Sequence, residues 1–272
     1  MSNAEPVIEV RNVSKIFEQT SLASPTLAID SLSLSIGRRE IVGLVGPSGC
    51  GKSALLHLIA GLDSFNAGEI LVEGRAVKGP QTLGYVFQQD TLLPWRNVLH
   101  NAEFALEIQG ADVETRRRKS KAWLDKLGLV KFTDHHPHQL SGGMRKRLQL
   151  ATVLAAEPRI LLMDEPFSAL DAQTRMLIED DFVRLCRETE MTVVFVTHDL
   201  PEAIAVCSRV IIMTARPGRV KSDYPINLPN SLSTIERRLH PDFHSHFAHI
   251  WDDLRGEVGS SLIETQTVFG QD

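Results

Sequence analysis

A glycine-rich octapeptide directly after a short apolar run is the feature that most constrains this chain. The apolar run covers residues 41–45, and the octapeptide is Gly46, Pro47, Ser48, Gly49, Cys50, Gly51, Lys52 and Ser53. It fits the pattern G-x-x-x-x-G-K-S, and apolar residues then recur at helical spacing over residues 52–62. A strand, a glycine-rich loop and a helix in this order predict a loop that wraps around phosphate groups.

The residue types in this loop suit nucleotide phosphates. Glycines allow backbone N–H groups to close around an anion, and the start of the following helix adds positive potential. Lys52 would reach the β and γ phosphates of ATP, Ser53 would bind Mg²⁺, and Ala54 is included among the expected nucleotide contacts. Cys50 is interpreted as a small structural residue rather than a nucleophile. A chance glycine turn is the alternative, and the loop alone would suit kinases or GTPases equally well.

Composition limits the class of protein. With 43% hydrophobic and 23% charged residues, the chain resembles ordinary globular proteins. No apolar run approaches the roughly 20 residues that a membrane-spanning helix needs, so a membrane role requires a partner. The N-terminus lacks the pattern of a secretory signal. Three scattered cysteines favour a reducing cytoplasm, and the net charge of −5 argues against nucleic acid as a partner.

The order of predicted elements indicates an α/β fold with a mainly parallel sheet. Strand patterns cover residues 7–13, 27–36, 68–74 and 83–87, and apolar strands resume at 160–163, 193–196 and 210–213. Between them, residues 90–158 read as an inserted helical lobe with helices at 97–109, 113–127 and 141–156. Residues 1–6 are expected to form an N-terminal arm and 7–235 the main domain, followed by a C-terminal helical extension at 236–272.

The end of the chain is expected to be a loop followed by one helix. After Gly218 the pattern weakens, and Pro225 and Pro229 punctuate a loop. Apolar residues over 243–254 then line one face of a helix that we expect to pack onto the main domain. A membrane-surface or partner helix is the alternative, which Asp252 and Asp253 oppose because anionic lipid repels them.

Two acids follow the buried strand at residues 160–163. Open α/β sheets bind ligands at the carboxyl ends of their strands, which is where Asp164 and Glu165 fall. Asp164 would hold Mg²⁺ and Glu165 would polarise the attacking water in phosphoryl transfer. Capping of the next helix is the plainer alternative for such a pair.

A second glycine-containing motif opens the helix before that strand: Leu140, Ser141, Gly142, Gly143 and Met144. Its serine and glycines at a helix start would form a second anion site, although an ordinary helix cap is the alternative. The motif resembles the signature of the ATP-binding cassette (ABC) ATPases, and the resemblance extends over about residues 7–218. It implies a P-loop NTPase fold with a RecA-like core, an N-terminal antiparallel β subdomain and an inserted helical subdomain. It also implies a head-to-tail homodimer in which the signature of one subunit closes over ATP held by the other.

The resemblance assigns further roles. Phe17 would stack on adenine, Gln88 would sense the γ-phosphate and bind Mg²⁺, Asp171 lies in the D-loop, and His198 is the switch histidine. Together with Lys52 and Glu165, the residues Gln88 and His198 form the expected catalytic set. This sequence departs from many members of the family at Met144, Lys146 and Thr152.

Three segments resemble the nitrate, sulfonate and taurine importer subfamily: residues 92–98, 166–171 and 215–219. The resemblance implies an ATPase at the cytoplasmic face of the membrane that binds a permease near residues 88–95. An extracytoplasmic solute-binding protein would deliver the cargo to that permease. An exporter or lipid-trafficking ATPase remains an alternative, as does a non-transport cassette protein.

Two polar clusters are assigned no function. The basic run at residues 116–119 is interpreted as the solvated face of a helix rather than a nucleic-acid site. The histidines lack the spacing and cysteine partners of a metal site; they are His135, His136, His138, His240, His244, His246 and His249.

Overall fold

The computed structural model describes residues 6–18 and 25–269, with side chains described as far as Glu257. The expected N-terminal arm therefore lies outside the described residues, except for Pro6. The chain divides into two compact units, one made of residues 1–81 and 192–272, the other of residues 82–191. The domain boundaries expected from the sequence remain a prediction.

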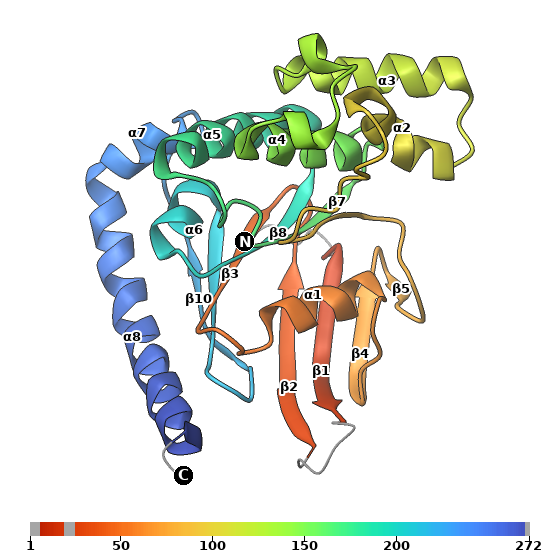
Figure 1. Cartoon of the computed structure of the whole chain (residues 1–272). Coiled ribbons are helices and arrows are strands. Elements are labelled where there is room, and N and C mark those ends of the chain that lie inside the picture. The colour runs from red at the N-terminus through yellow and green to blue at the C-terminus, as the bar shows by residue number, and fades with distance from the viewer. Residues whose placement is uncertain (1–5, 19–24, 270–272) are drawn as a thin grey trace. The chain divides into compact units, whose positions relative to one another are not determined.

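An antiparallel sheet opens the first unit (Figure 1). Its strand order is β2-β1-β4-β5, and its strands are β1 (Ile8–Phe17), β2 (Thr26–Ile36), β4 (Ala67–Val72) and β5 (Arg75–Ala76). Along β1, Ile8, Val10 and Val13 are buried, and exposed positions lie between them. One covered face and one solvated face explain why the hydrophobic pattern of this sheet alternates.

Parallel strands form the second layer of the first unit. β3 (Ile41–Val45) runs parallel to both β8 (Thr192–Thr197) and β9 (Arg209–Met213), and β10 (Val220–Pro225) pairs antiparallel with β9. Every residue of β8 is buried, as expected for a strand covered on both faces. The helices α1 (Lys52–Ala60) and α6 (Leu200–Val206) belong to the same unit.

The prediction of a loop after Gly218 was wrong in two places, where the structure has a strand and a helix. β10 is an edge strand whose residues alternate between half-buried and exposed, so its hydrophobic pattern is weak, and Pro225 occupies its last position. The helix α7 (Thr234–Leu239) follows a capping box formed by Ser233 and Glu236. That Ser-x-x-Glu spacing is the sequence signal that could have indicated α7.

The C-terminal helix α8 (Pro241–Phe269) packs onto the first unit, as expected (Figure 1). Its apolar face buries Phe243, Ile250 and Leu254. Polar contacts attach it to β10, because Asp253 accepts hydrogen bonds from Ser222 and from Tyr224, the latter at 2.6 Å. Within the described parts of the chain, none of the helices combines the length and apolar character that a bilayer crossing requires.

The second unit is mostly helical. Its two strands, β6 (Gly84–Val86) and β7 (Ile160–Asp164), pair in parallel. Side chains of Asn97, Asp112, Ser141 and Asp171 each accept a backbone N–H at a helix start. The helices are α2 (Val98–Ile108), α3 (Val113–Lys126), α4 (Gly142–Leu154) and α5 (Ala172–Thr189), with short 3₁₀ turns at Val130–Phe132 and Pro137–Gln139. An antiparallel subdomain, a parallel core and a helical segment confirm the expected fold class.

Candidate active site

The glycine-rich loop lies in the turn between β3 and α1, which is the order of strand, loop and helix that the sequence predicts. Gly51 caps α1 with a φ angle of 102°, a left-handed conformation that favours glycine. A Cβ at this position would also come within 3.1 Å of the carbonyl oxygen of Ala28. The loop therefore enters α1 with its backbone N–H groups at the helix start, where an anion is stabilised.

Lys52 lies across this loop. Its Nζ donates hydrogen bonds to the carbonyl oxygens of Gly46 at 2.7 Å and Pro47 at 2.9 Å, and the residue is 6% exposed. The Cys50 Sγ lies 3.8 Å from the same Nζ, and burial raises the pKa of the Cys50 thiol. Because a thiol with a raised pKa is a poor nucleophile, a structural role for Cys50 is favoured.

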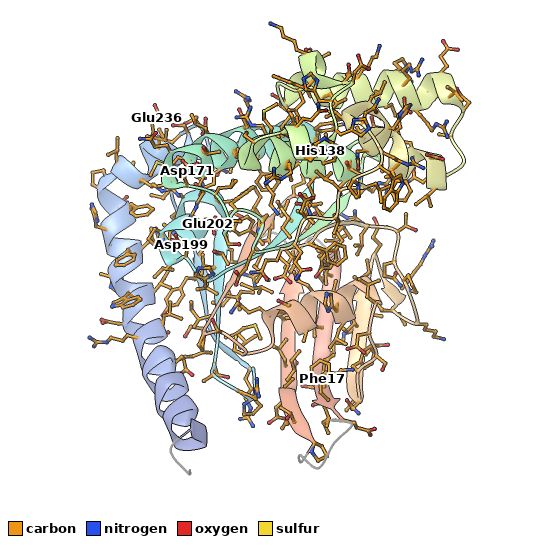
Figure 2. All side chains as sticks on the ribbon, viewed as in Figure 1. Phe17, His138, Asp171, Asp199, Glu202 and Glu236 are labelled. Atoms are coloured by element: carbon orange, nitrogen blue, oxygen red, sulfur yellow. The ribbon has the colours of Figure 1, made fainter. Side chains whose placement is uncertain are left out.

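His198 directly follows β8, between two residues that are held by hydrogen bonds. Thr197 Oγ1 accepts from the backbone N–H of Asp199 at 3.0 Å and donates to the Glu202 carboxylate. Asp199 in turn caps α6 by accepting from the N–H of Glu202 at 3.1 Å, and both residues are labelled in Figure 2. The backbone on both sides of His198 is thus held in place. Sequence analysis missed Thr197, Asp199 and Glu202, although Asp-x-x-Glu after a strand is a helix-start pattern.

Phe17 is the last residue of β1 (Figure 2) and is 40% exposed. The Nζ of Lys15 lies 4.8 Å from the centroid of its ring, and Lys15 is itself paired with Asp63 at 2.7 Å. A partly exposed aromatic ring at a strand end is suited to stacking on a flat heterocycle.

The second unit brings Gln88 and Glu165 together. The parallel pair β6 and β7 ends at one edge, just before these residues, and Gln88 Nε2 donates to Glu165 Oε2 at 2.9 Å. Glu165 has a φ angle of 42°, which costs a residue with a side chain about 1–2 kcal/mol. Asp164, the last residue of β7, is 7% exposed.

The side chains expected to bind magnesium all carry oxygen donors. Asp164 offers a carboxylate, Ser53 a hydroxyl, and Gln88 an amide oxygen, because its hydrogen bond to Glu165 uses the amide nitrogen. Oxygen donors of this kind, few in number and supplemented by water and phosphate, fit Mg²⁺. Among the described residues, no group of three or more His, Cys, Asp or Glu side chains could hold a metal ion by itself.

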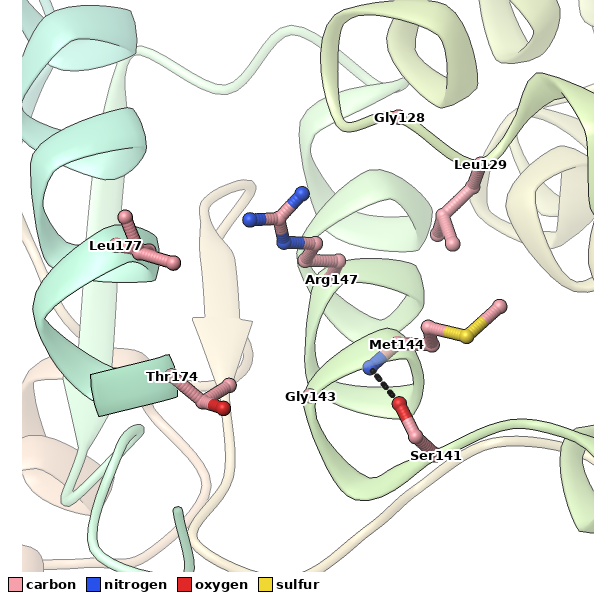
Figure 3. A pocket seen from close by; sticks show the side chains of 8 residues that line it. All are labelled: Gly128, Leu129, Ser141, Gly143, Met144, Arg147, Thr174 and Leu177. Carbon is pink, nitrogen blue, oxygen red and sulfur yellow. Dashed lines mark hydrogen bonds between the residues drawn. The ribbon is translucent and has the colours of Figure 1, made fainter. Parts of the chain in front are cut away.

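The motif at residues 140–144 starts α4. The Ser141 hydroxyl accepts from the N–H of Met144 at 3.3 Å, so Ser141 is a helix cap whether or not it also binds an anion. A Cβ on Gly143 would lie 2.6 Å from Thr174 Cγ2, so glycine permits α4 to approach α5 closely. A pocket of about 240 Å³ lies beside this helix start (Figure 3), with Thr174 and Leu177 of α5 facing α4.

Asp171 and Thr152 have local roles in the second unit. Asp171 caps α5 by accepting from the N–H of Thr174 at 3.0 Å, and this hydrogen bond lowers the pKa of its carboxyl. The Thr152 hydroxyl donates to the carbonyl oxygen of Leu148 in its own helix at 3.0 Å. Thr152 therefore satisfies its hydroxyl within α4.

A glycine-rich loop before α1 in one unit and a glycine motif that opens α4 in the other are thus both present. The family model described as ABC transporter matches residues 29–168. The chain belongs to the ABC transporter family. It is an ATP-binding subunit with ATPase activity, and its cassette fold agrees with solved members. A dimeric structure of a bacterial ABC transporter cassette is 31% identical, with a TM-score of 0.72, over 82% of this chain and 100% of that chain.

Three curated relatives cover between 74% and 94% of the chain. An uncharacterised ABC transporter ATP-binding protein of Methanocaldococcus jannaschii is 42% identical over 94% of both chains. A nitrate import ATP-binding protein of Synechocystis is 36% identical over 92% of this chain and 95% of the relative. A taurine import ATP-binding protein of Yersinia pestis is 42% identical over 74% of this chain and 79% of its own length.

Proposed function

We propose that this ABC ATPase powers the import of a small solute, an anion such as nitrate or a sulfonate, or taurine. The observation that carries the proposal is its similarity to two import proteins, at 36% and 42% identity. The segments that resemble this subfamily support the same choice. ATPase subunits of this kind contact a permease rather than the cargo.

Each site residue receives a role in ATP hydrolysis. The backbone of the loop and Lys52 hold the phosphates, Phe17 stacks on adenine, and Glu165 orients the attacking water. The carboxamide of Gln88 holds Glu165 by the bond described above, and His198 donates to the γ-phosphate. Ser53, Gln88 and Asp164 would hold Mg²⁺, which when bound would neutralise charge on the β and γ phosphates.

The working form is a head-to-tail homodimer. In this arrangement Ser141, Gly142 and Gly143 of one subunit complete the ATP site of the other, with Asp171 next to them. The cap geometry of Ser141 supports the role, because residues 141–143 start a helix of 13 residues whose N-terminus favours an anion. A related cassette has been solved as a dimer, and another structure of it holds ADP and phosphate.

The permease would dock beside the segment between β6 and α2, at the cytoplasmic face of the membrane. Trp95 in this segment is 73% exposed, which is an unusually large exposed fraction for a large aromatic side chain. Its neighbour Arg96 is held by Glu107 at 2.6 Å and lies over the ring of Phe104. Trp95 is thus an exposed tryptophan next to a residue whose side chain is held in place. Such tryptophans are typical anchor residues of interfaces.

The experiment is co-purification with any permease and solute-binding protein that are encoded beside this gene, followed by reconstitution in liposomes. The Trp95→Ala variant is expected no longer to co-purify with the permease, and its ATPase rate should no longer rise when loaded binding protein is added. Its ATP binding should stay unchanged. Trp251→Ala, at a 42% exposed tryptophan on α8, is the matched control. Titrating the binding protein with candidate anions identifies the cargo. ATP-driven efflux from the same liposomes, or no permease partner, would overturn import in favour of an exporter or a non-transport protein.

A further inference from the structure

Lys146 is a charged residue that lies buried inside the second unit. It is on α4 and is 9% exposed. Its Nζ donates to the carbonyl oxygens of Phe87 at 3.3 Å and Gln88 at 3.4 Å, and to Gln149 Oε1 at 2.8 Å. The buried ammonium is therefore directed at backbone oxygens of the segment that carries Gln88.

Gln149, one helical turn further along α4, holds the same segment. It is 2% exposed, and its Nε2 donates to the carbonyl oxygens of Phe87 at 3.2 Å and Gln89 at 3.0 Å, and contacts Thr91 Oγ1 at 3.2 Å. Residues 87–91, here named the Gln88 loop, thus have three consecutive carbonyl groups bonded to two side chains of α4. Because buried polar groups need hydrogen-bond partners, these two side chains and the loop satisfy one another.

We propose that Lys146 is a positioning residue that attaches the Gln88 loop to α4 and so holds the Gln88 carboxamide against Glu165. The pair Lys146 and Gln149 supplies the backbone contacts, and the Gln88 side chain supplies the contact to Glu165 at 2.9 Å. Because one rigid helix begins at Ser141 and carries Lys146 and Gln149 in its middle, a displacement of its start moves the loop as well. This proposal rests on the role proposed above for Gln88 and Glu165.

The opposing reading is that Lys146 only fills space in the unit. Asp90 of the Gln88 loop is a charged residue that acts on Lys146, and it favours the charged form of the lysine. Arg145 is itself paired with Asp90, at 3.4 Å. A lysine that only fills space would be replaced without local consequence by methionine, which has similar length and no donor. A positioning lysine would not.

The test compares Lys146→Met with Lys146→Gln, which removes the charge but keeps an N–H donor. Lys121→Met, at an exposed lysine of α3, is the matched control. Amide hydrogen exchange of peptides covering residues 84–95 is measured in the full chain without nucleotide, together with the steady-state kinetics of ATP hydrolysis. The exchange readout is independent of activity.

Lys146→Met is expected to speed exchange in the Gln88 loop about five- to tenfold, while exchange over α3 stays unchanged. This size corresponds to the net contribution of about one ordinary hydrogen bond, because the two contacts of Lys146 to the loop are long, at 3.3 Å and 3.4 Å. The kcat is expected to fall about tenfold with KM for ATP changed less than about twofold, because phosphate contacts remain. Lys146→Gln is expected to stay within about threefold of the unmodified protein in both readouts.

Unchanged exchange in the Gln88 loop of Lys146→Met would overturn the proposal, as would equal loss in Lys146→Gln and Lys146→Met. Faster exchange confined to the loop with normal kcat would leave the attachment standing and refute the role proposed for Gln88. Gln88→Ala, which keeps the backbone contacts, checks that role separately and is expected to lower kcat without altering exchange over α4.

Discussion

Gln88 and Glu165 lie 77 positions apart in the chain, and Gln88 Nε2 donates to Glu165 Oε2 at 2.9 Å. The two side chains meet because β6 and β7 are parallel neighbours that end at the same edge. A glutamate held by an amide keeps its carboxylate in one orientation, which is the requirement for directing a water molecule at a phosphate. The hydrogen bond from Gln88 therefore holds the Glu165 carboxylate in the fixed orientation that its proposed role in hydrolysis requires.

Glu165→Gln is expected to lower kcat about 100- to 1,000-fold and leave ATP affinity within about twofold, because the charge that polarises water is lost while phosphate contacts remain. An ATP-bound dimer should accumulate, as size-exclusion chromatography with labelled ATP would detect. Glu157→Gln is the matched control, since Glu157 also has a positive φ, of 51°, and is paired with Lys119. Near-normal turnover of Glu165→Gln would remove Glu165 from the catalytic set.

The shared site predicts complementation between two inactive variants. Lys52→Ala weakens nucleotide binding in its own subunit, whereas Ser141→Arg leaves binding intact and obstructs the site of the other subunit. A mixed dimer contains one site with both changes and one with neither. Mixing equal amounts should therefore restore up to about a quarter of the unmodified rate, since about half the dimers are mixed and each has one intact site.

Controls for the mixing experiment follow from the cap at α4. Ser141→Arg also removes a helix cap, which costs about 1 kcal/mol, so its melting temperature and ATP binding are measured first. Each variant alone should stay inactive at every concentration. No recovery on mixing two folded proteins would contradict the head-to-tail arrangement.

Neighbouring glycines of the α4 motif are expected to respond differently to alanine. A Cβ at Gly143 would lie 2.6 Å from Thr174 Cγ2, whereas a Cβ at Gly142 meets no atom within 4 Å. Gly143→Ala should lower the free energy of unfolding by about 1–3 kcal/mol through overpacking. Gly142→Ala should raise it slightly or leave it unchanged, because alanine favours helix.

Chemical denaturation measures both glycine variants. Adding Thr174→Ser to Gly143→Ala removes the clashing methyl group and should recover most of the lost stability. Equal effects of Gly142→Ala and Gly143→Ala would show that the two helices do not need the close approach.

The buried ammonium of Lys146 predicts an unusual dependence of stability on pH. Burial lowers the pKa of Lys146 to about 8 from 10.5, against the opposing effect of Asp90. Below pH 8 the folded and unfolded chains both carry the proton, and the cost of burying the charge is fully present. Between pH 8 and 10.5 the unfolded chain binds a proton that the folded chain lacks, so stability from this group rises with pH.

Urea unfolding of the unmodified protein and of Lys146→Met, compared across this pH interval, isolates the contribution. The free energy of unfolding of the unmodified protein, minus that of Lys146→Met, should increase as pH rises, because the variant lacks the titrating group. A difference that is constant with pH would mean that the pKa of Lys146 is not lowered.

Chemistry between residues close together in the chain determines much of this protein. The loop at Lys52 was predictable because the glycines, the lysine and the following helix are adjacent, and each acts through its nearest neighbours. The same holds for Ser141 as a helix cap. The β-strand at Val220–Pro225 could not be predicted, since an edge strand buries too little to leave a clear pattern.

Only the tertiary structure decided which distant side chains meet. Three contacts join segments that strand pairing or helix packing brings together. They are the hydrogen bond from Gln88 to Glu165, the hydrogen bonds from Lys146 to the Gln88 loop, and the close approach of Gly143 to Thr174. Hydrophobic periodicity specifies which face of an element is buried and not which neighbour covers it. The sequence by itself thus determined an ATP-binding cassette, and the folded chain decided how the Gln88 loop is held.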